Sequence, residues 1–289
     1  MKNVINYYYG IIVNEFKKRD NSFIFIINDI EFEFIQYYDD INKLLNIYSI
    51  LKNYRRNSHD IIINKNNNFI TYYENNPYIL LKKIKYSKKN IELDDILEYD
   101  CNIYIREELN WKKMWKDKID YYEFQIGENG LKYPLLKQSF GYYLGLSEIA
   151  INLLNYVNYK NITYCISHKR IEKIDNLYNP INMIIDNKSR DIAEYIKLKF
   201  FSNDIKLEEI TNTINKKIFT KDEILLFLAR LIYPSYYFDI YEKIYKNKEF
   251  EKDLNKIIKK NVEYETFLKQ IYNQIKLLYV IPQIEFLEY

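Results

Sequence analysis

Three charged side chains that could act together lie in the segment IIDNKSRDIAEYIKLKFF (184–201), which joins an apolar run to an amphipathic helix. They are Asp186, Arg190 and Asp191. An aspartate at the end of a buried strand is a candidate Mg²⁺ ligand, but this ion needs several oxygens and a lone carboxylate makes a poor site. Asp186 is therefore a candidate metal ligand, and we favour a structural role for it as a turn or loop acceptor.

The neighbouring charges favour structural roles more strongly. Asp191 lies near the start of the expected helix, where the helix dipole and the free backbone N–H groups both stabilise a carboxylate. Arg190 can pair with a loop carboxylate. Arg230 is a cation within the apolar helical segment 219–234, so we expect it to bridge to a carboxylate and to organise the helical part of the chain.

Cysteine and histidine are too sparse to build an ordinary zinc site. The two cysteines, Cys101 and Cys165, are far apart in the sequence, and His59 and His168 are the only histidines. Structural zinc needs four such ligands at close spacing. The same cysteine usage fits a reducing cytoplasm without a disulfide framework.

The composition is that of a folded chain. Charged residues make up 29% and hydrophobic residues 48% of the 289 positions, with five Gly and five Pro. The abundance of Tyr, Phe, Asn, Ile and Lys follows from A/T-rich codons, so tyrosine runs are weak indications of stacking sites. A net charge of +3 is too balanced to indicate nucleic-acid binding. We interpret the densest basic run, KKIKYSKK (82–89), as a solvated linker.

No apolar stretch approaches the roughly 18 residues of a membrane-spanning helix, and the start MKNVINYYYG lacks the apolar core of a signal peptide. The sequence therefore predicts neither a membrane protein nor export by a standard signal.

The first 85 residues predict strands around one helix. SFIFIIND (22–29) and EFEFIQYY (31–38) are β-rich and tightly joined, and 39–53 has helical spacing. DIIIN, FITYYE and PYILLKK follow, separated by KNNN and ENN, where Asn tolerates positive φ. These features predict a small antiparallel sheet with one covering helix.

The rest of the chain predicts helices with one short strand-loop-strand. The expected helices are 110–126, 139–157, 219–234, 235–260 and 262–279, and the expected strands are 162–168 and 181–186. The first helix places an apolar stripe on one face, which we interpret as core: Trp111, Met114, Trp115, Ile119, Tyr122 and Ile126. Thr220 and Glu223 have capping-box spacing, and that helix should end before Pro234.

A β-rich lobe over 1–85 and a helical lobe over 86–289 give the element order of a two-lobed, protein-kinase-like α+β fold.

Several segments carry a family resemblance. They are YYLGLSEIAI (142–151), SHKRI (167–171), IIDNKSRDIAEYIKLKFF (184–201), ARLIYPSYYFDIYEKIY (229–245) and the closing IPQIEFLEY. In these stretches the chain resembles spore-coat-associated, kinase-like proteins of the CotS/YutH kind, distant relatives of aminoglycoside phosphotransferases and choline kinases. The resemblance implies an aminoglycoside phosphotransferase-like fold with a cleft between two lobes, and a place in the bacterial spore coat.

In active relatives a His-x-Asp loop supplies the base, a later Asn helps to hold metal, and an Asp ending the next strand binds Mg²⁺. By resemblance, His168 matches the His, Lys169 the middle position, and Arg170 the position of the catalytic Asp. Asp175 or Asn176 lies near the metal-binding Asn position. Asp186 then matches the metal Asp, and Asp191 the Asp that buttresses the loop.

The loop His168, Lys169, Arg170 is degenerate as a catalytic element, because a guanidinium cannot accept a proton at neutral pH. We interpret His168 as a hydrogen-bonded loop residue. Phosphoryl transfer also needs a phosphate cradle and a cation, but only Gly10 occurs in the first 40 residues and EFEFIQYY has no lysine. An acidic side chain that fills the place of the Arg170 guanidinium, beside a lysine of the β-rich lobe, would overturn this interpretation.

The favoured hypothesis is a catalytically degenerate, pseudokinase-like protein with a structural or interaction role, with spore coat components as partners and no cofactor. Its location would be the cytoplasm or the spore coat. The alternative is an active ATP-dependent phosphotransferase with rearranged catalytic residues, which would require Mg-ATP. A nucleic-acid binder using KKIKYSKK ranks last, because base composition accounts for that run.

Overall fold

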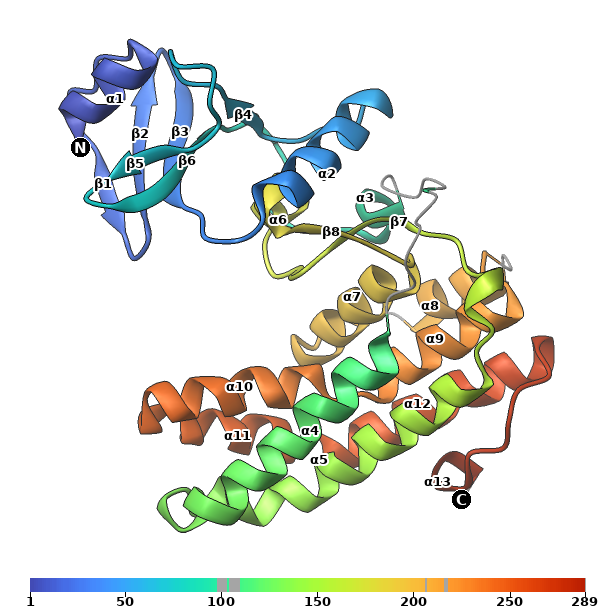
Figure 1. The fold of residues 1–289 in the computed structure, drawn as a ribbon. Helices are drawn as coiled ribbons and strands as arrows, with labels where there is room; N and C mark the ends of the chain where they lie inside the picture. The colour runs from blue at the N-terminus through green and yellow to red at the C-terminus, as the bar shows by residue number, and fades with distance from the viewer. Residues whose placement is uncertain (98–102, 104–109, 206, 216–217, 289) are drawn as a thin grey trace. The chain divides into compact units, whose positions relative to one another are not determined.

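Figure 1 shows the computed structural model, which describes residues 1–97, 103, 110–205, 207–215 and 218–288. Cys101 lies outside these residues, and Cys165 is buried, with its Sγ 3.8 Å from the Ser167 hydroxyl oxygen.

The chain forms two compact units that interleave along the sequence. Unit 1 consists of Met1–Tyr99 and His168–Ile184. Unit 2 consists of Asp100–Ser167 and Ile185–Tyr289. The loop after His168 therefore belongs to the unit that contains the N-terminal sheet. The division into 1–85 and 86–289 stays a prediction.

Unit 1 contains an antiparallel sheet in the order β1-β2-β3-β6-β4, with β5 also paired to β6. The strands are β1 (Lys17–Arg19), β2 (Ser22–Ile27), β3 (Ile30–Gln36), β4 (Asp60–Ile62), β5 (Thr71–Tyr73) and β6 (Asn76–Lys82). The expected small antiparallel sheet is confirmed.

Two tight turns set the register of this sheet. Asn75, in the ENN turn, has the expected positive φ. Glu74 beside it and the pair Asn28 and Asp29 also have positive φ, and the four values lie between 48° and 62°. Two successive residues with positive φ make a hairpin turn whose twist matches that of the flanking strands. Ile27 accordingly pairs with Ile30 across the β2–β3 turn.

Helices cover the sheet of unit 1. The expected helix is α2 (Ile41–Asn53), whose N-terminus is capped by the Asp40 carboxylate. An additional helix, α1 (Lys2–Tyr9), was not expected; it ends at Gly10, which has a φ of 69°. Its Ile5 packs with Phe25 and Phe34 in a buried cluster. Shorter segments of unit 1 are α3 (Leu93–Leu97), α6 (Ile174–Tyr178) and η4 (Pro180–Asn182).

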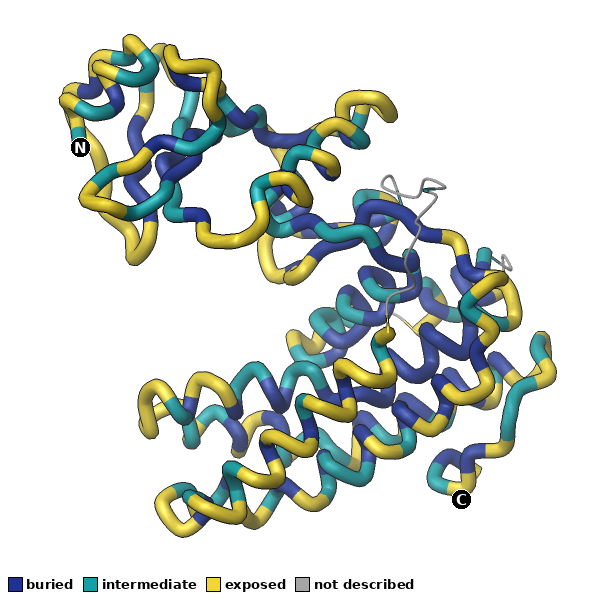
Figure 2. The backbone as a smooth tube through the Cα atoms, in the orientation of Figure 1, coloured by how far each residue is buried: buried dark blue, intermediate teal, exposed yellow. Residues whose placement is uncertain are grey.

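Unit 2 is helical. Its helices are α4 (Trp111–Asn129), α5 (Pro134–Leu153), α7 (Ser189–Phe201), α8 (Leu207–Asn215), α9 (Lys221–Ile232), α10 (Ser235–Lys246), α11 (Glu251–Ile258), α12 (Asn261–Leu278) and α13 (Glu285–Glu288). The expected segment 235–260 is interrupted after Lys246, and α8 was not expected. Buried residues line the inner faces of these helices, as Figure 2 shows.

The predicted strand-loop-strand is present as β7 (Cys165–His168) and β8 (Met183–Asp186), which form a two-stranded sheet.

Helix α9 is the central element of unit 2. Every residue from Glu223 to Ile232 is buried, and α5 and α7 pack against it. Its N-terminus has the expected capping box: the Thr220 hydroxyl accepts from Glu223 N, and the Glu223 carboxylate accepts from Thr220 N.

The expected apolar stripe on α4 is only partly correct. Trp115, Ile119 and Tyr122 are buried, whereas the side of α4 that carries Met114 faces solvent, so Met114 is 52% exposed and does not belong to the core. Methionine is flexible and is tolerated at either location, so its type did not distinguish them. None of the described helices is both long and apolar enough to cross a membrane.

Replacing Thr220 with alanine removes the cap of the most buried helix, so Thr220→Ala should lower the free energy of unfolding by about 1 kcal/mol. Urea denaturation followed by circular dichroism measures this. Thr266→Ala is the matched control, because Thr266 is exposed and its hydroxyl donates to a carbonyl of its own helix. Equal losses in both variants would contradict a special role for the cap.

Candidate functional site

The loop after β7 is anchored by a buried histidine. His168 is fully buried, and its Nε2 lies 3.2 Å from the carbonyl oxygen of Leu177, to which it can only donate. The backbone N–H of Lys169 donates to the carbonyl of Asn182 at 2.6 Å, and its ammonium donates to Asp39 at 3.0 Å. These contacts hold the loop in place, as the interpretation of His168 as a hydrogen-bonded loop residue requires.

Arg170 is exposed, and its backbone is fixed by one amide side chain. The N–H of Arg170 donates to the Asn182 side chain at 3.1 Å, and that side chain donates back to the Arg170 carbonyl at 2.7 Å. The Asn176 side-chain oxygen accepts from the backbone N–H groups of Glu172 and Lys173, so Asn176 is a turn acceptor in this structure. Catalytic or metal-binding roles for Arg170 and Asn176 stay predictions.

Asp175 belongs to an ion cluster around a buried lysine, which the sequence did not indicate. The Lys83 ammonium lies 3.1 Å from Glu31, 3.0 Å from Glu33 and 3.2 Å from Asp175. The Lys83 side chain is only 8% exposed. The run KKIKYSKK is therefore not a solvated linker at this position. One cation among three carboxylates leaves the cluster with excess negative charge.

A buried histidine and a tyrosine complete the cluster. His59 Nε2 and the Tyr86 hydroxyl each lie 3.2 Å from Asp175 Oδ1. The backbone N–H of Ile84 donates to His59 Nδ1, so in this neutral tautomer Nε2 carries the proton and donates to Asp175. Asp175 Oδ1 therefore faces three donors, from His59, Lys83 and Tyr86.

These contacts shift the pKa values of Asp175 and Lys83 in the direction that favours the charged form of each. Burial alone would raise the pKa of Asp175, but the hydrogen bond from His59 and the charge of Lys83 outweigh it and leave that pKa well below its usual range. Burial likewise opposes the charge of Lys83, yet attraction from Glu33 and Asp175 leaves the pKa of Lys83 above its ordinary value.

Asp186 lies in unit 2 and accepts four hydrogen bonds. Its Oδ1 accepts from the Trp111 ring N–H at 3.2 Å and from the Asn187 backbone at 2.7 Å. Its Oδ2 accepts from Arg230 at 2.8 Å and from Arg190 at 3.3 Å. A carboxylate offers about four lone-pair positions, so these donors leave Asp186 no free acceptor.

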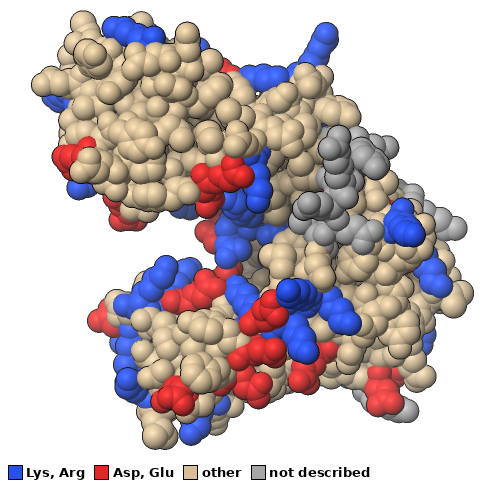
Figure 3. Space-filling view, in the orientation of Figure 1, with Lys and Arg blue, Asp and Glu red and all other residues tan. Residues whose placement is uncertain are grey.

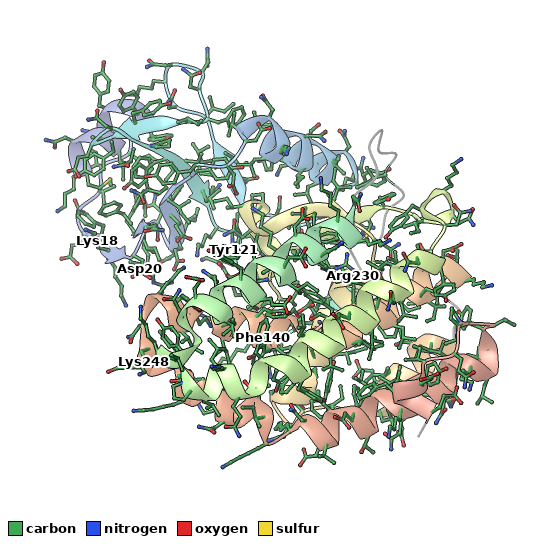
Figure 4. All side chains as sticks on the ribbon, turned by 60° about the horizontal axis from the view of Figure 1, so that its bottom comes forward. Lys18, Asp20, Tyr121, Phe140, Arg230 and Lys248 are labelled. Atoms are coloured by element: carbon green, nitrogen blue, oxygen red, sulfur yellow. The ribbon has the colours of Figure 1, made fainter. Side chains whose placement is uncertain are left out.

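The two guanidinium groups also pack on an indole ring. Arg230 and Arg190 lie 4.6 Å and 5.0 Å from the centre of the Trp111 ring, within the range of cation–π attraction. Figure 4 shows Arg230 among the helices of unit 2. Burial lowers the pKa of Arg230, and Asp186 opposes that effect. Arg230 is the bridge to a carboxylate that its position in an apolar helix predicted.

The same region contains two further anchors. Asn187 donates from its side chain to Glu223 at 2.9 Å and to the Thr163 carbonyl at 2.7 Å. Its side-chain oxygen accepts from Ser189 N at the start of α7. Asp191 is buried in the first turn of α7, where the helix dipole favours a carboxylate.

The described residues do not offer a ready metal site, since no group of three His, Cys, Asp or Glu side chains among them is arranged to hold an ion. Two guanidinium groups on Asp186 would also repel a divalent cation. The residues present therefore do not fit the Mg²⁺ ion that phosphotransferases use, and metal binding by Asp186 or Asp175 stays a prediction.

Solved structures of other proteins share the fold of this chain. Similar solved structures include an aminoglycoside phosphotransferase from Alicyclobacillus acidocaldarius, at a TM-score of 0.66 and 10% identity, covering 96% of this chain and 97% of that one. Another is the spectinomycin phosphotransferase APH(9)-Ia in its AMP-bound complex, at a TM-score of 0.58 and 13% identity, covering 96% of each chain. The chain thus has the aminoglycoside phosphotransferase fold, an α+β fold of an antiparallel sheet and a larger helical part.

The family follows from the sequence match. The model of the family described as "Spore coat putative kinase YutH" matches residues 2–271, so the chain belongs to this family. A curated relative, the endospore coat-associated protein YutH of Bacillus subtilis (strain 168), is 29% identical over 188 residues. That match spans 55% of this chain and about half, 54%, of the relative. The resemblance noted in the sequence is confirmed.

Replacing Asp186 should destabilise unit 2, because Asp186→Ala leaves Arg230 buried without its counter-charge. Breaking one side of a buried pair costs about 3–5 kcal/mol. Chemical denaturation measures the loss. Asp253→Ala is the matched control, since the Asp253–Lys256 pair is exposed and such pairs contribute about 0–1 kcal/mol. An Asp186→Ala variant as stable as Asp253→Ala would show that the four contacts are dispensable.

Replacing Lys83 should produce a pH-dependent loss of stability. In Lys83→Met the three carboxylates face one another without a cation, which disfavours their ionisation. The loss is expected to be largest near neutral pH and to shrink below about pH 4 as the carboxylates take up protons. In the wild type, Asp175 stabilises the fold through its depressed pKa at pH values above its unfolded-state pKa, and this contribution declines as the pH falls. The stabilities of the wild type and the variant therefore converge at low pH.

Thermal unfolding of Lys83→Met between about pH 2 and pH 8 checks this expectation, with Lys85→Met, a replacement of an exposed lysine of the same run, as control. A deficit that is constant across this pH range would contradict the cluster as described.

Proposed function

We propose that this chain is a catalytically degenerate member of the kinase fold that acts through protein contacts in the bacterial spore coat. The observation that carries the proposal is the state of Asp186, whose carboxylate accepts from Arg230, Arg190, Trp111 and Asn187. An active phosphotransferase needs free side-chain oxygens that hold a metal ion against the phosphates of the nucleotide. Two guanidinium groups donate to Asp186 Oδ2, an oxygen that a metal ion would otherwise need, and this supports the proposal.

The base position supports the same conclusion. Arg170 is an exposed guanidinium whose Nη1 donates to the Lys169 carbonyl at 3.1 Å. A guanidinium stays protonated at physiological pH and cannot take a proton from an attacking hydroxyl. Loss of a general base costs about 10²- to 10⁴-fold in rate.

The hairpin at the start of the sheet gives further support. β1 and β2 are joined by Asp20 and Asn21 alone, since Arg19 pairs with Ser22. In kinases a glycine-rich loop between strands covers the phosphates with backbone N–H groups. This short hairpin has no glycine, and Asp20 adds a negative charge that phosphates repel.

The spore coat assignment rests on the family to which the chain belongs and on its relative in Bacillus subtilis, which is an endospore coat-associated protein. A protein whose candidate metal-binding carboxylate is bound by its own side chains is suited to a scaffold role, with coat proteins as partners. We expect no bound cofactor.

The alternative is an active phosphotransferase with relocated groups, and one observation favours it. Asp175 lies beside Lys83, a lysine that follows β6 of the sheet. A carboxylate next to such a lysine is the pair that catalysis on this fold would use. Lys83 is, however, bound by three carboxylates, so its charge is not free for phosphates.

A nucleic-acid role has less support. On the face shown in Figure 3, lysines and arginines are interspersed with aspartates and glutamates. In the basic run, Lys83 is paired within its cluster and Lys88 is paired with Glu92 and Asp95. Binding through phosphates needs free clustered cations.

Mg-ATP is expected to leave the unfolding temperature of the purified protein unchanged. A nucleotide present at about 100 times its Kd would add about 2.7 kcal/mol to the free energy of unfolding, which a thermal-shift titration detects easily. A clear shift, or phosphate release with any divalent metal, would contradict the proposal.

If turnover is found, two variants identify the machinery. The relocated-site alternative requires that Asp175→Asn and Asp186→Ala abolish turnover while the fold stays intact. Loss of turnover only in proportion to loss of folded protein would assign both residues to structure.

A further inference from the structure

A pocket of about 600 Å³ lies within unit 2, where the end of α5 and the turn η2 (Leu154–Tyr156) face the C-terminal segment. We call it the α5–tail pocket. Its volume falls in the range of small-molecule sites. The residues that matter for its chemistry are Asn152, Asn155, Tyr156, Gln283, Glu285 and Phe286.

The wall formed by the C-terminal segment is fixed in place. Ile284 and Leu287 are buried, and the backbone N–H of Ile284 donates to the Tyr272 hydroxyl at 3.1 Å. The Tyr272 hydroxyl in turn donates to Glu288 at 2.9 Å, and Lys276 also donates to Glu288. The pocket therefore has two preformed walls, and a ligand would not have to order the chain segment that forms its second side.

The lining combines an apolar base with a polar rim. Leu153 and Ile284 are buried apolar side chains of the lining. Three carboxamides surround them, and Asn152, Asn155 and Gln283 are all exposed. Each carboxamide carries both a donor and an acceptor. Among these three carboxamides, Asn155 makes one long contact of 3.5 Å with Asn152, so most of their hydrogen-bonding capacity faces the pocket or solvent.

The charged and polar groups of the lining disfavour several classes of ligand. The lining has no lysine or arginine, and Glu285 is its one charged residue, so a phosphate or carboxylate ligand would be repelled. One carboxylate is also too few to hold a metal. A purely apolar ligand would leave the amides without partners, at a cost of polar desolvation.

Tyr156 is 62% exposed and Phe286 is half-buried, so both walls present an aromatic ring beside polar groups. A sugar matches this combination: its hydroxyls donate to and accept from carboxamides, and its C–H face packs on an aromatic ring. We propose that the α5–tail pocket binds a neutral saccharide. This site is independent of whether the chain transfers phosphate.

Saturation-transfer NMR and calorimetry with the full chain test the proposal, using maltotriose, cellotriose and chitotriose as probes. At least one trisaccharide should bind with a Kd of about a millimolar. Tyr156→Ala and Asn155→Ala should each weaken binding about three- to tenfold, as loss of one contact or hydrogen bond does. Tyr72→Ala is the matched control, because Tyr72 is similarly exposed, at 65%, in unit 1.

The competing ligand for such a pocket is a basic peptide, attracted by Glu285. Glu285→Gln keeps an acceptor but removes the charge, so trisaccharide binding should be retained. Binding of a trilysine peptide that Glu285→Gln abolishes, without trisaccharide binding, would overturn the proposal. So would the absence of saturation transfer from all three trisaccharides, or equal weakening by Tyr156→Ala and Tyr72→Ala.

Discussion

The buried carboxylate of Asp186 is the constraint on which the rest of unit 2 depends. A carboxylate removed from water is strongly destabilising unless it is paired and fully hydrogen-bonded. Arg230 from α9, Arg190 from α7, Trp111 from α4 and the backbone of Asn187 together meet that requirement. Three helices are thereby tied to the end of β8. The arrangement that satisfies the charge also uses every position through which Asp186 could bind a metal.

Unit 1 also contains a buried charged group that must be paired, but in this unit the group is a cation. There a buried ammonium, Lys83, is held by Glu31, Glu33 and Asp175. His59 links β4 to α6, because its backbone N–H donates to the Tyr178 carbonyl and its ring contacts Asp175. In both units, buried charged groups are paired with one another inside the fold. Such pairing stabilises the fold and lowers the availability of the same groups for a substrate, which connects the structure to the proposed scaffold role.

Local patterns in the sequence were enough for much of the fold. Asn-rich turns, the Thr220–Glu223 capping box and the apolar strands act within a few residues, so their outcomes could be predicted. The role of Arg230 also followed, since a cation in an apolar helix needs a counter-charge. Lys83 could not be recognised, because its partners Glu33 and Asp175 are distant in sequence and its own run looks solvated. Met114 was wrongly assigned to the core, and α1 was not predicted. Both errors arose because side-chain type alone does not fix which face of a helix packs against the protein.

We propose that Asp186 is a structural anchor and not a metal ligand. Electron paramagnetic resonance of free Mn²⁺, titrated with protein in the presence of ATP, tests it most directly when the wild type is compared with Asp186→Asn, which conserves the side-chain shape. The account predicts that the free Mn²⁺ signal is the same with both proteins. A signal that the wild type diminishes and Asp186→Asn restores would contradict it and would make Asp186 a metal ligand.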